Sequence, residues 1–406
     1  MKDFEMMEKK RNLIRECPIC GYIVKTKFKL NFEDLLGSGE KIYTQHVGLC
    51  HNCGFIFTQN PFTSEQLDNR YKNMSKFEYD APAYVLDNDY KRQSHRQKHF
   101  LEENLDFSEI HSILEVGASS GYNLSLYKDQ CERILGIEPS ALNCKLSMDK
   151  YGVNLFNGMF NEFVERRANE QFDLVFLSMV LEHIVSPGFF IEEIEDVKPK
   201  YIFIEVPTLD LRHQEEPMGI FAEEHVNLFT LDSLNMLMSS KGYSLVNVEN
   251  IYGLRRYLPA GYPAIATIWK KSIEVCPTLQ YNLFSSEECL DRYISDSKTR
   301  LDILRRRIAM IPDNEKLALW GVGHHVSMLL ANSDLHKKNI VKVYDSDSRK
   351  HGIKFAGIEI SAFEKKDIED GDVDGILITT YTAQKAILRY IEKLNLKCRL
   401  YTLYDL

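Results

Sequence analysis

Short apolar runs alternate with polar, helix-forming segments through the central part of the chain. Residues 110–116 read IHSILEV, and their apolar positions predict a strand. The small residues of 117–121 end this run, and residues 123–127 have the pattern of a helix start. A second apolar run, 133–137, ends at Glu138. A strand, a turn of small residues and a helix form the first unit of a doubly wound α/β sheet, where ligands bind at the carboxyl ends of strands.

The same alternation extends the sheet toward the C-terminus. Further strands are predicted at residues 154–156, 172–177 and 201–207, and two later segments, 246–252 and 264–269, are expected to pair as an antiparallel hairpin. Thr230 is a suitable N-cap for a helix at 231–241. Residues 55–105, rich in Tyr, Asn and charge, are interpreted as a helical connection that covers the active site.

A second α/β pattern follows a charged linking helix predicted at 285–309. Strands are expected at residues 317–320, 340–344 and 373–380, with a helix at 383–394. Gly321-x-Gly323 lacks the third glycine of the dinucleotide fingerprint, and a lone G-x-G is weak evidence for a bound dinucleotide. We therefore favour a Rossmann-like module that contacts substrate without a cofactor of its own.

Two C-x-x-C pairs stand near the N-terminus. They are formed by Cys17, Cys20, Cys50 and Cys53. Each pair places two thiolates on one tight turn, and a glycine follows each turn directly. Two such turns can bring four sulfurs to a tetrahedral zinc, and four thiolates leave no open position, so the predicted zinc is structural. His46 and His51 are near enough to compete as ligands, and the alternative interpretation is four free cysteines in a core.

The turn after the first predicted strand reads Glu115-x-Gly117-x-Ser119-x-Gly121. It resembles motif I of class I S-adenosylmethionine-dependent methyltransferases, with Ser119 in place of the middle glycine. A dinucleotide site would prefer G-x-G-x-x-G, and a structural turn without ligand is the remaining alternative. Glu138 could take both ribose hydroxyls. The candidate cofactor-binding residues are Glu115, Gly117, Ala118, Ser119, Gly121, Glu138, Met159, Phe160 and Ser178, of which Met159 and Phe160 are expected beside the adenine.

Composition and charge narrow the classes of partner. The chain has 406 residues, 44% of them hydrophobic, and 50 basic against 59 acidic residues give a net charge of −9. That balance does not favour nucleic acid, which needs a basic face. No apolar run suggests a signal peptide or a membrane span, so a cytoplasmic protein is expected, and its nine cysteines do not indicate a disulfide framework.

The order of these parts resembles the three-domain sugar C-methyltransferase family. The marks are the paired C-x-x-C, the motif at 115–121, Leu181-Glu182-His183 and Glu224-His225. The resemblance implies a zinc-binding domain at 1–75, a methyltransferase core with linking helix at 76–310, and a Rossmann-like domain at 311–406 that helps to hold substrate. It also implies methylation of a nucleotide-linked keto sugar next to its carbonyl, through an enolate that attacks the methyl group of S-adenosylmethionine.

The same resemblance makes His225 the expected base, with Glu224 beside it and His183 as a second histidine of the cleft. One departure is Ala222, where the family usually has Tyr; the loss of a phenol removes a donor that could stabilise an enolate. Two alternatives stay open: an O-methyltransferase acting on a sugar or sugar nucleotide, and a zinc-bearing scaffold without catalysis. The sequence does not indicate the oligomeric state.

Overall fold

The computed structural model describes residues 14–33, 42–73, 84–167, 169–214, 216–252, 262–272, 283–381, 383–394 and 396–405. These residues fall into two compact units. The first is drawn from Met1–Lys27, Val47–Gln214 and Glu223–Tyr293, and the second from Phe28–His46, Glu215–Ala222 and Ile294–Leu406. All four cysteines of the C-x-x-C pairs lie in the first unit, together with the predicted methyltransferase core of 76–310 except residues 215–222 and 294–310, which belong to the second. The expected division into domains at residues 75 and 310 stays a prediction.

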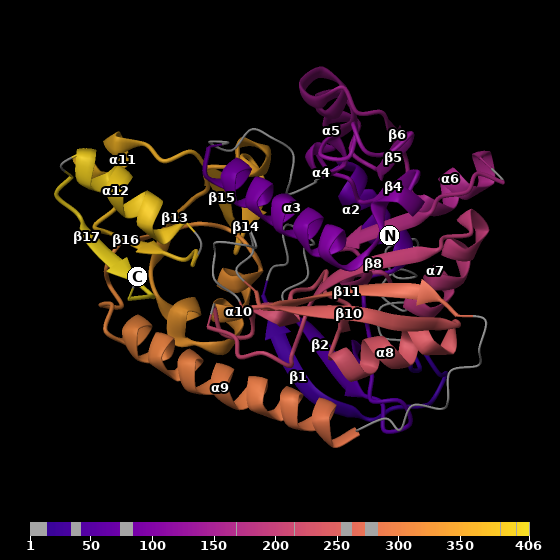
Figure 1. Cartoon of the computed structure of the whole chain (residues 1–406). Coiled ribbons are helices and arrows are strands. Elements are labelled where there is room, and N and C mark those ends of the chain that lie inside the picture. Colours follow the sequence, from indigo (N-terminus) through magenta and orange to yellow (C-terminus); the bar gives the residue numbers. More distant parts are fainter. Residues whose placement is uncertain are drawn as a thin grey trace, which may run out of the picture. The chain divides into compact units, whose positions relative to one another are not determined.

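The first unit is built on a seven-stranded sheet of order β10-β11-β8-β7-β4-β5-β6. Its strands are β4 (Ser112–Val116), β5 (Arg133–Glu138), β6 (Leu155–Asn157), β7 (Leu174–Ser178), β8 (Tyr201–Pro207), β10 (Tyr243–Ile251) and β11 (Ala264–Lys271). The strands from β6 to β8 are parallel, and β11 and β10 add an antiparallel edge beside β8, as Figure 1 shows. This is the Rossmann-like class I methyltransferase fold, and the predicted fold class is confirmed.

Helices separate these strands along the chain. They are α3 (Tyr84–Asn104), α4 (Tyr122–Ser125), α5 (Ala141–Leu146), α6 (Phe160–Arg166), α7 (Pro187–Ile194) and α8 (Leu231–Ser240). Thr230 caps α8 as predicted, because its side chain accepts a hydrogen bond from the Ser233 amide. Apolar side chains of the central strands are buried on both faces of the sheet, in two separate clusters. A sheet covered on both faces explains why the strands read as continuous apolar runs.

A smaller sheet lies around the cysteine pairs. Its order is β1-β2-β3-β9, with β1 at Thr26–Phe32, β2 at Tyr43–Leu49, β3 at Ile56–Thr58 and β9 at Asn227–Leu228. Residues Val47–Leu49 of β2 pair antiparallel with β3, and β3 pairs antiparallel with β9. Helix α2 (Ser64–Asn73) follows. The pairing of β3 with β9 joins the cysteine region to the segment that carries Glu224 and His225.

The second unit carries a six-stranded sheet of order β14-β15-β13-β12-β16-β17. Its strands are β12 (Leu317–Trp320), β13 (Ile340–Tyr344), β14 (Lys354–Phe355), β15 (Ile358–Ser361), β16 (Gly375–Ile378) and β17 (Arg399–Thr402). The accompanying helices are α9 (Leu283–Ala309), which belongs to this unit from Ile294 onward, α10 (His324–Asn332), α11 (Lys365–Glu369) and α12 (Gln384–Leu394). β12, β13, β15, β16 and β17 are parallel, so the predicted C-terminal Rossmann-like sheet is confirmed. In the part of the chain that the structure describes, each helix is too short or too polar to cross a bilayer.

Candidate functional site

The loop after β4 has the tight turns that its small residues predict. Gly117 and Gly121 have φ angles of 74° and 73°, and Ser119 also has a positive φ of 48°. A Cβ at Gly117 would approach Val180 Cγ2 to 2.9 Å, and one at Gly121 would approach Ser147 Oγ to 2.0 Å. The glycine at 121 is therefore required by backbone conformation and by close packing of the protein on itself.

Glu138 lies at the carboxyl end of β5 and organises this loop. Its Oε2 accepts a hydrogen bond from the Ser119 amide, and its Oε1 accepts one from the Ser140 amide, both at 2.9 Å. The backbone of the loop after β4 is thus bonded to the side chain at the end of β5. The Ala118 amide also donates to the carbonyl oxygen of Ile137, at 3.1 Å. The carboxylate group is held in one orientation at the strand end, which suits a role as hydrogen-bond acceptor for a cofactor.

Glu115 is placed differently from Glu138. It is 3% exposed, inside β4, and its Oε1 accepts a hydrogen bond from Asn123 Nδ2 at 2.9 Å. Burial raises the pKa of Glu115 to about 8, although the hydrogen bond from Asn123 opposes that shift. In the described part of the chain its Oε2 has no hydrogen-bond partner. The motif acid is therefore a core residue beneath the loop.

The strand beside β4 in the sheet also ends in a strained residue. Ser178 is the last residue of β7, and Met179 follows it with φ of 54°. Left-handed backbone at a non-glycine residue costs energy and concentrates at functional sites. Two such residues, Ser119 and Met179, therefore mark the carboxyl ends of adjacent strands, which is where this fold binds ligands.

Met159 and Phe160 begin α6 after β6. The Met159 amide donates to Glu162 Oε2 at 3.0 Å, which closes the first turn. Phe160 is 5% exposed and packs edge-on against Phe190, with ring centroids 5.4 Å apart. An apolar wall at the end of β6 is present, and its contact with adenine stays a prediction.

Two histidines expected in the cleft meet at the end of β7. The rings of His183 and His225 have centroids 5.1 Å apart, although the residues come from separate loops. His183 Nδ1 lies 2.9 Å from the backbone carbonyl oxygen of Glu224. A carbonyl only accepts, so Nδ1 carries the proton and, in the neutral ring, Nε2 carries the lone pair. Glu224 therefore orients His183 through its main chain.

Glu182 completes this cluster. Its side chain is 2% exposed, and its Oε1 lies 3.7 Å from His183 Nε2. Burial raises the pKa of Glu182 to about 8, and among the described residues its Oε2 finds no hydrogen-bond partner. One ligand atom each from Glu182, His183 and His225 lie within 4.8 Å of one another, near enough to exchange a proton or to hold a cation. The sequence marks Glu182 only as part of the Leu181-Glu182-His183 motif.

One aromatic neighbour of His225, Tyr262, and a further buried histidine, His213, were missed from the sequence. Tyr262 packs edge-on against the His225 ring, with centroids 5.7 Å apart. His213 lies 4.8 Å from Tyr293 and contacts the Thr208 carbonyl oxygen through Nε2 at 2.8 Å, so it is a buried structural histidine. Tyr262 precedes β11 and reaches His225 only because that strand pairs with β8; no spacing in the sequence signals it.

The C-x-x-C pairs form one four-sulfur cluster. Cys17 Sγ lies 3.5 Å from Cys53 Sγ, and Cys20 Sγ lies 3.5 Å from Cys50 Sγ. The ligand atoms of all four lie within 4.8 Å of one another. Tetrahedral zinc with Zn–S bonds of about 2.3 Å requires sulfurs about 3.8 Å apart, so the donor set fits such an ion. The amides of Gly21 and Gly54 bond to the carbonyls of Cys17 and Cys50, which gives both turns the same form.

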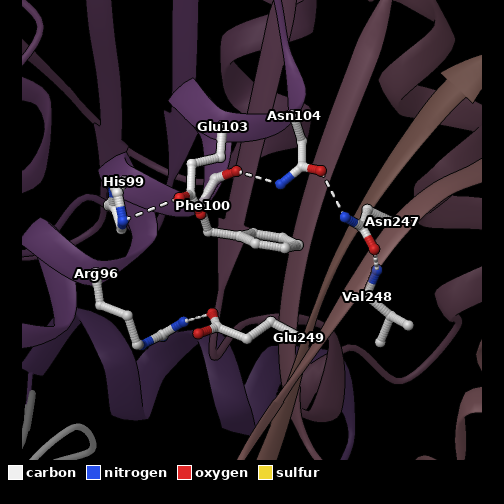
Figure 2. Close-up of a pocket in the computed structure, with 8 residues that line it drawn as sticks. All are labelled: Arg96, His99, Phe100, Glu103, Asn104, Asn247, Val248 and Glu249. Carbon is white, nitrogen blue, oxygen red and sulfur yellow. Dashed lines mark hydrogen bonds and ion pairs between the residues drawn. The ribbon is translucent and has the colours of Figure 1, made fainter.

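A shallow surface cavity lies elsewhere in the first unit. Figure 2 shows its lining, from α3 and the edge strand β10: Arg96, His99, Phe100, Glu103, Asn104, Asn247, Val248 and Glu249. Arg96 donates to Glu249 at 2.6 Å, and Asn104 and Asn247 bond to each other. The cavity stands at the edge of the sheet, whereas the glycine loop follows the central strand β4.

Comparisons with known proteins identify this part of the chain. Residues 87–248 match the model of a family described as Methyltransferase domain. Those residues form a class I, S-adenosylmethionine-dependent methyltransferase domain. Residues 313–399 match a second family, described as C2185-like, N-terminal.

Individual relatives are distant. C-methyltransferase NovU of Streptomyces niveus is 21% identical over 252 residues, 58% of this chain and 57% of that protein, so the chain spans little more than half of this relative. The Burkholderia thailandensis 1,6-didemethyltoxoflavin-N1-methyltransferase, solved with S-adenosylhomocysteine, is 13% identical, with a TM-score of 0.40 over 56% of this chain and 96% of that one. The N-methyltransferase NodS of Bradyrhizobium japonicum is 13% identical, with a TM-score of 0.38 over 50% of this chain and 98% of that one.

Proposed function

We propose that the protein transfers a methyl group from S-adenosylmethionine to a carbon next to a carbonyl, in a nucleotide-linked keto sugar. The observation that carries this proposal is the pair of imidazoles, His183 and His225, with centroids 5.1 Å apart at the end of β7. Carbon acids need a base held over the C–H bond, and imidazole has a pKa near the working pH. The likeness to a C-methyltransferase supports carbon as the methylated atom.

In this proposal His225 removes the proton from the acceptor carbon. Its ring is 7% exposed, so the proton is taken away from bulk water, and His183 lies beside it to receive or share the charge. The Glu224 carbonyl fixes the His183 ring through Nδ1, which leaves Nε2 toward Glu182. Glu224 thus acts by orientation.

The loop after β4 and the end of β5 form the proposed cofactor site. Glu138 accepts hydrogen bonds from the ribose hydroxyls. The turn beside them is formed by Gly117, Ala118, Ser119 and Gly121, and the residues nearest the adenine are Met159 and Phe160. S-adenosylmethionine supplies an electrophilic methyl group when it is bound. The protein's own contribution is to hold the acceptor carbon in line with the methyl group, to hold the base over the C–H bond, and to exclude water. Residues 311–406 are proposed to help to hold the nucleotide part of the acceptor.

The test of the base is His225→Ala. Cofactor binding should be kept, while the methylation rate falls about 10²–10⁴-fold, the usual share of general base catalysis. Exchange of the acceptor's α-proton with deuterated solvent, which needs no methyl transfer, should fall with it. His213→Asn is the matched control, because His213 is also a buried histidine bonded to a backbone carbonyl. Exchange at the parent rate in His225→Ala would exclude this base and make His183 the next candidate.

Product analysis tests which atom is methylated. A C-methyl group survives conditions that cleave an ether, so a product that loses its new methyl group would favour O-methylation of a sugar or sugar nucleotide. Binding of S-adenosylmethionine without turnover of any ketose would instead favour a scaffold without catalysis.

The four-cysteine cluster is proposed to hold one structural zinc ion. The sulfur spacings of 3.5 Å and the four thiolates support this choice. Structural zinc is worth on the order of 10 kcal/mol in small domains at neutral pH. Cys50→Ser should therefore release the metal and unfold the cysteine region, while Cys131→Ser, at a buried cysteine outside the cluster, should keep it. Elemental analysis that finds no zinc in the purified parent would refute the proposal.

A further inference from the structure

Two glutamines on one face of α3 reach the end of β7. Gln93 and Gln97 are four residues apart, so they lie one above the other on the helix. They are 4% and 2% exposed. Gln97 Nε2 lies 2.9 Å from Ser178 Oγ, and Gln93 Nε2 lies 3.3 Å from the same oxygen. Ser178 Oγ therefore accepts hydrogen bonds from two side-chain amides of a helix that precedes it by some 80 residues in sequence.

The orientation of the Gln93 amide is set by a buried carboxylate. Gln93 Nε2 lies 2.8 Å from Glu205 Oε1, and a carboxylate accepts, so the nitrogen must face it. Glu205 is fully buried in β8, opposite Ser178 in the strand pairing, and its other oxygen forms an ion pair with Arg96. Arg96 also holds Glu249 at the surface cavity of Figure 2. Two residues of α3, Gln93 and Arg96, are thus fixed to the sheet by one acidic group.

The hydroxyl of Ser178 keeps its O–H group available as a hydrogen-bond donor. A serine oxygen accepts two hydrogen bonds and donates one. Both acceptor positions are taken by Gln93 and Gln97, so only the O–H donor remains. Within the described ranges, the structure shows no acceptor for that proton. Ser178 is only half-buried, unlike the two glutamines, and Met179 turns the chain out of the sheet immediately after it.

We propose that Gln93 and Gln97 fix the Ser178 hydroxyl as a hydrogen-bond donor to a negatively charged oxygen of a bound ligand. The inference rests on the proposed function and adds two positioning residues and a donor to it. Apart from the phosphates of the nucleotide, two anionic groups occur in that reaction: the carboxylate of S-adenosylmethionine and the enolate of the acceptor. A donor that needs no reorganisation stabilises such charge more than water does, because its dipole is aimed before the ligand arrives.

The test uses Ser178→Ala, Ser178→Thr and Gln97→Met in the full chain. Calorimetry measures the affinity for S-adenosylmethionine, and solvent exchange of the acceptor's α-proton measures enolate formation. Ser178→Ala should lower one of the two about 10- to 100-fold, the usual worth of a hydrogen bond to a charged group. Lower affinity assigns the donor to the cofactor carboxylate, and slower exchange at unchanged affinity assigns it to the enolate. Ser178→Thr keeps a hydroxyl and should restore the parent value.

The glutamine is tested through its coupling to the serine. Gln97→Met keeps the shape of the side chain and should reproduce part of the Ser178→Ala loss, but it should add nothing in the Ser178→Ala background. Ser94→Ala is the matched control, because Ser94 is a buried α3 hydroxyl that donates to the helix carbonyl of Tyr90. Thermal unfolding of each variant checks that it is folded.

The outcomes separate this inference from the proposed function. A parent that binds S-adenosylmethionine and exchanges the α-proton, with Ser178→Ala equal to it in both assays, would overturn the donor role and leave the function standing. Equal losses from Gln97→Met with and without Ser178 would overturn the positioning role. A parent that fails to bind S-adenosylmethionine would refute the proposed function itself.

Discussion

The two Rossmann-like sheets of this chain contain the same local unit with different endings. In each, a strand, a glycine turn and a helix precede a second strand with an acid at its carboxyl end: Glu138, the last residue of β5, and Asp345, directly after β13. Each acid bonds a backbone amide of the glycine turn, Ser119 at 2.9 Å and Val322 at 2.8 Å. The local geometry that a ribose-binding acid requires therefore occurs twice.

The endings differ in what surrounds the acid. Asp345 Oδ2 forms an ion pair with Lys350 Nζ at 3.0 Å, and the same ammonium donates to the Val322 carbonyl at 2.6 Å. Lys350 thus ties the acid to its own glycine turn, and a ribose would have to displace a charged partner. Glu138 is held by the amides of Ser119 and Ser140. The same pattern thus places its acid beside an ammonium group in one sheet and beside backbone amides in the other, so the pattern alone does not specify a cofactor site.

The first strands of the two units also differ. β4 carries Glu115 two residues before Gly117, whereas β12 carries Leu319 two residues before Gly321. Both side chains are buried. A buried carboxyl destabilises the fold when it ionises, and leucine has no such cost. The first sheet therefore keeps a costly group beneath its glycine turn, and a structural role alone does not call for one.

The largest difference between the two glycine turns should be the loss of stability when a glycine is replaced by alanine. Gly121→Ala forces a side chain at φ of 73° and 2.0 Å from Ser147 Oγ. Left-handed backbone costs about 1–2 kcal/mol and overpacking about 1–3 kcal/mol, so unfolding free energy should fall by roughly 2–5 kcal/mol. Gly323→Ala, at the start of α10, has extended backbone and nothing within 4 Å of its Cβ, and should be neutral. Urea unfolding measures both, and equal losses would refute the distinction.

Glu115 should make the stability of the protein depend on pH. Its pKa is about 8 in the fold against 4.5 for the unfolded chain. Between those values the unfolded state has released the proton and the folded state keeps it, so stability falls as pH rises from about 4.5 to about 8. Glu115→Gln keeps the acceptor for Asn123 and removes this term. It should gain about 4 kcal/mol over the parent at pH 8 and about 1 kcal/mol at pH 5, since one pKa unit is worth about 1.4 kcal/mol and the folded and unfolded pKa values differ by about 3.5.

Leu319→Met is the control for that measurement, because it changes the equivalent buried position of β12 without a titratable group. Its difference from the parent should be the same at pH 5 and pH 8. A Glu115→Gln gain that is also independent of pH would show that Glu115 ionises normally in the fold.

The smallest effect concerns the two acids. Glu138→Ala should weaken S-adenosylmethionine binding about tenfold or more, because hydrogen bonds to a charged group contribute about 1.5–3 kcal/mol each. Asp345→Ala should leave that affinity unchanged, since Asp345 is bonded within its own turn and to Lys350. Calorimetry gives both constants. Equal affinities for the parent and Glu138→Ala would place the cofactor elsewhere.

Most elements could be predicted because their signal is local. The strands at 201–207 and 317–320 and the cap at Thr230 are found where the sequence places them. Local signals also set the limits of the prediction. His111 was assigned to the first strand, yet β4 begins at Ser112 and His111 is exposed. Residues 75–76, the predicted domain boundary, lie outside the described residues.

The sequence by itself determined the parts that depend on near neighbours: the alternation that makes strands, the two cysteine turns and the glycine turn after β4. Only the tertiary structure decided which distant groups meet. His183 reaches the Glu224 carbonyl across 41 residues, and Gln97 reaches Ser178 across 81. Such contacts depend on strand order and on the covering helix. The burial that raises the pKa values of Glu115 and Glu182 depends on the packed core, because desolvation is a property of all the surrounding atoms.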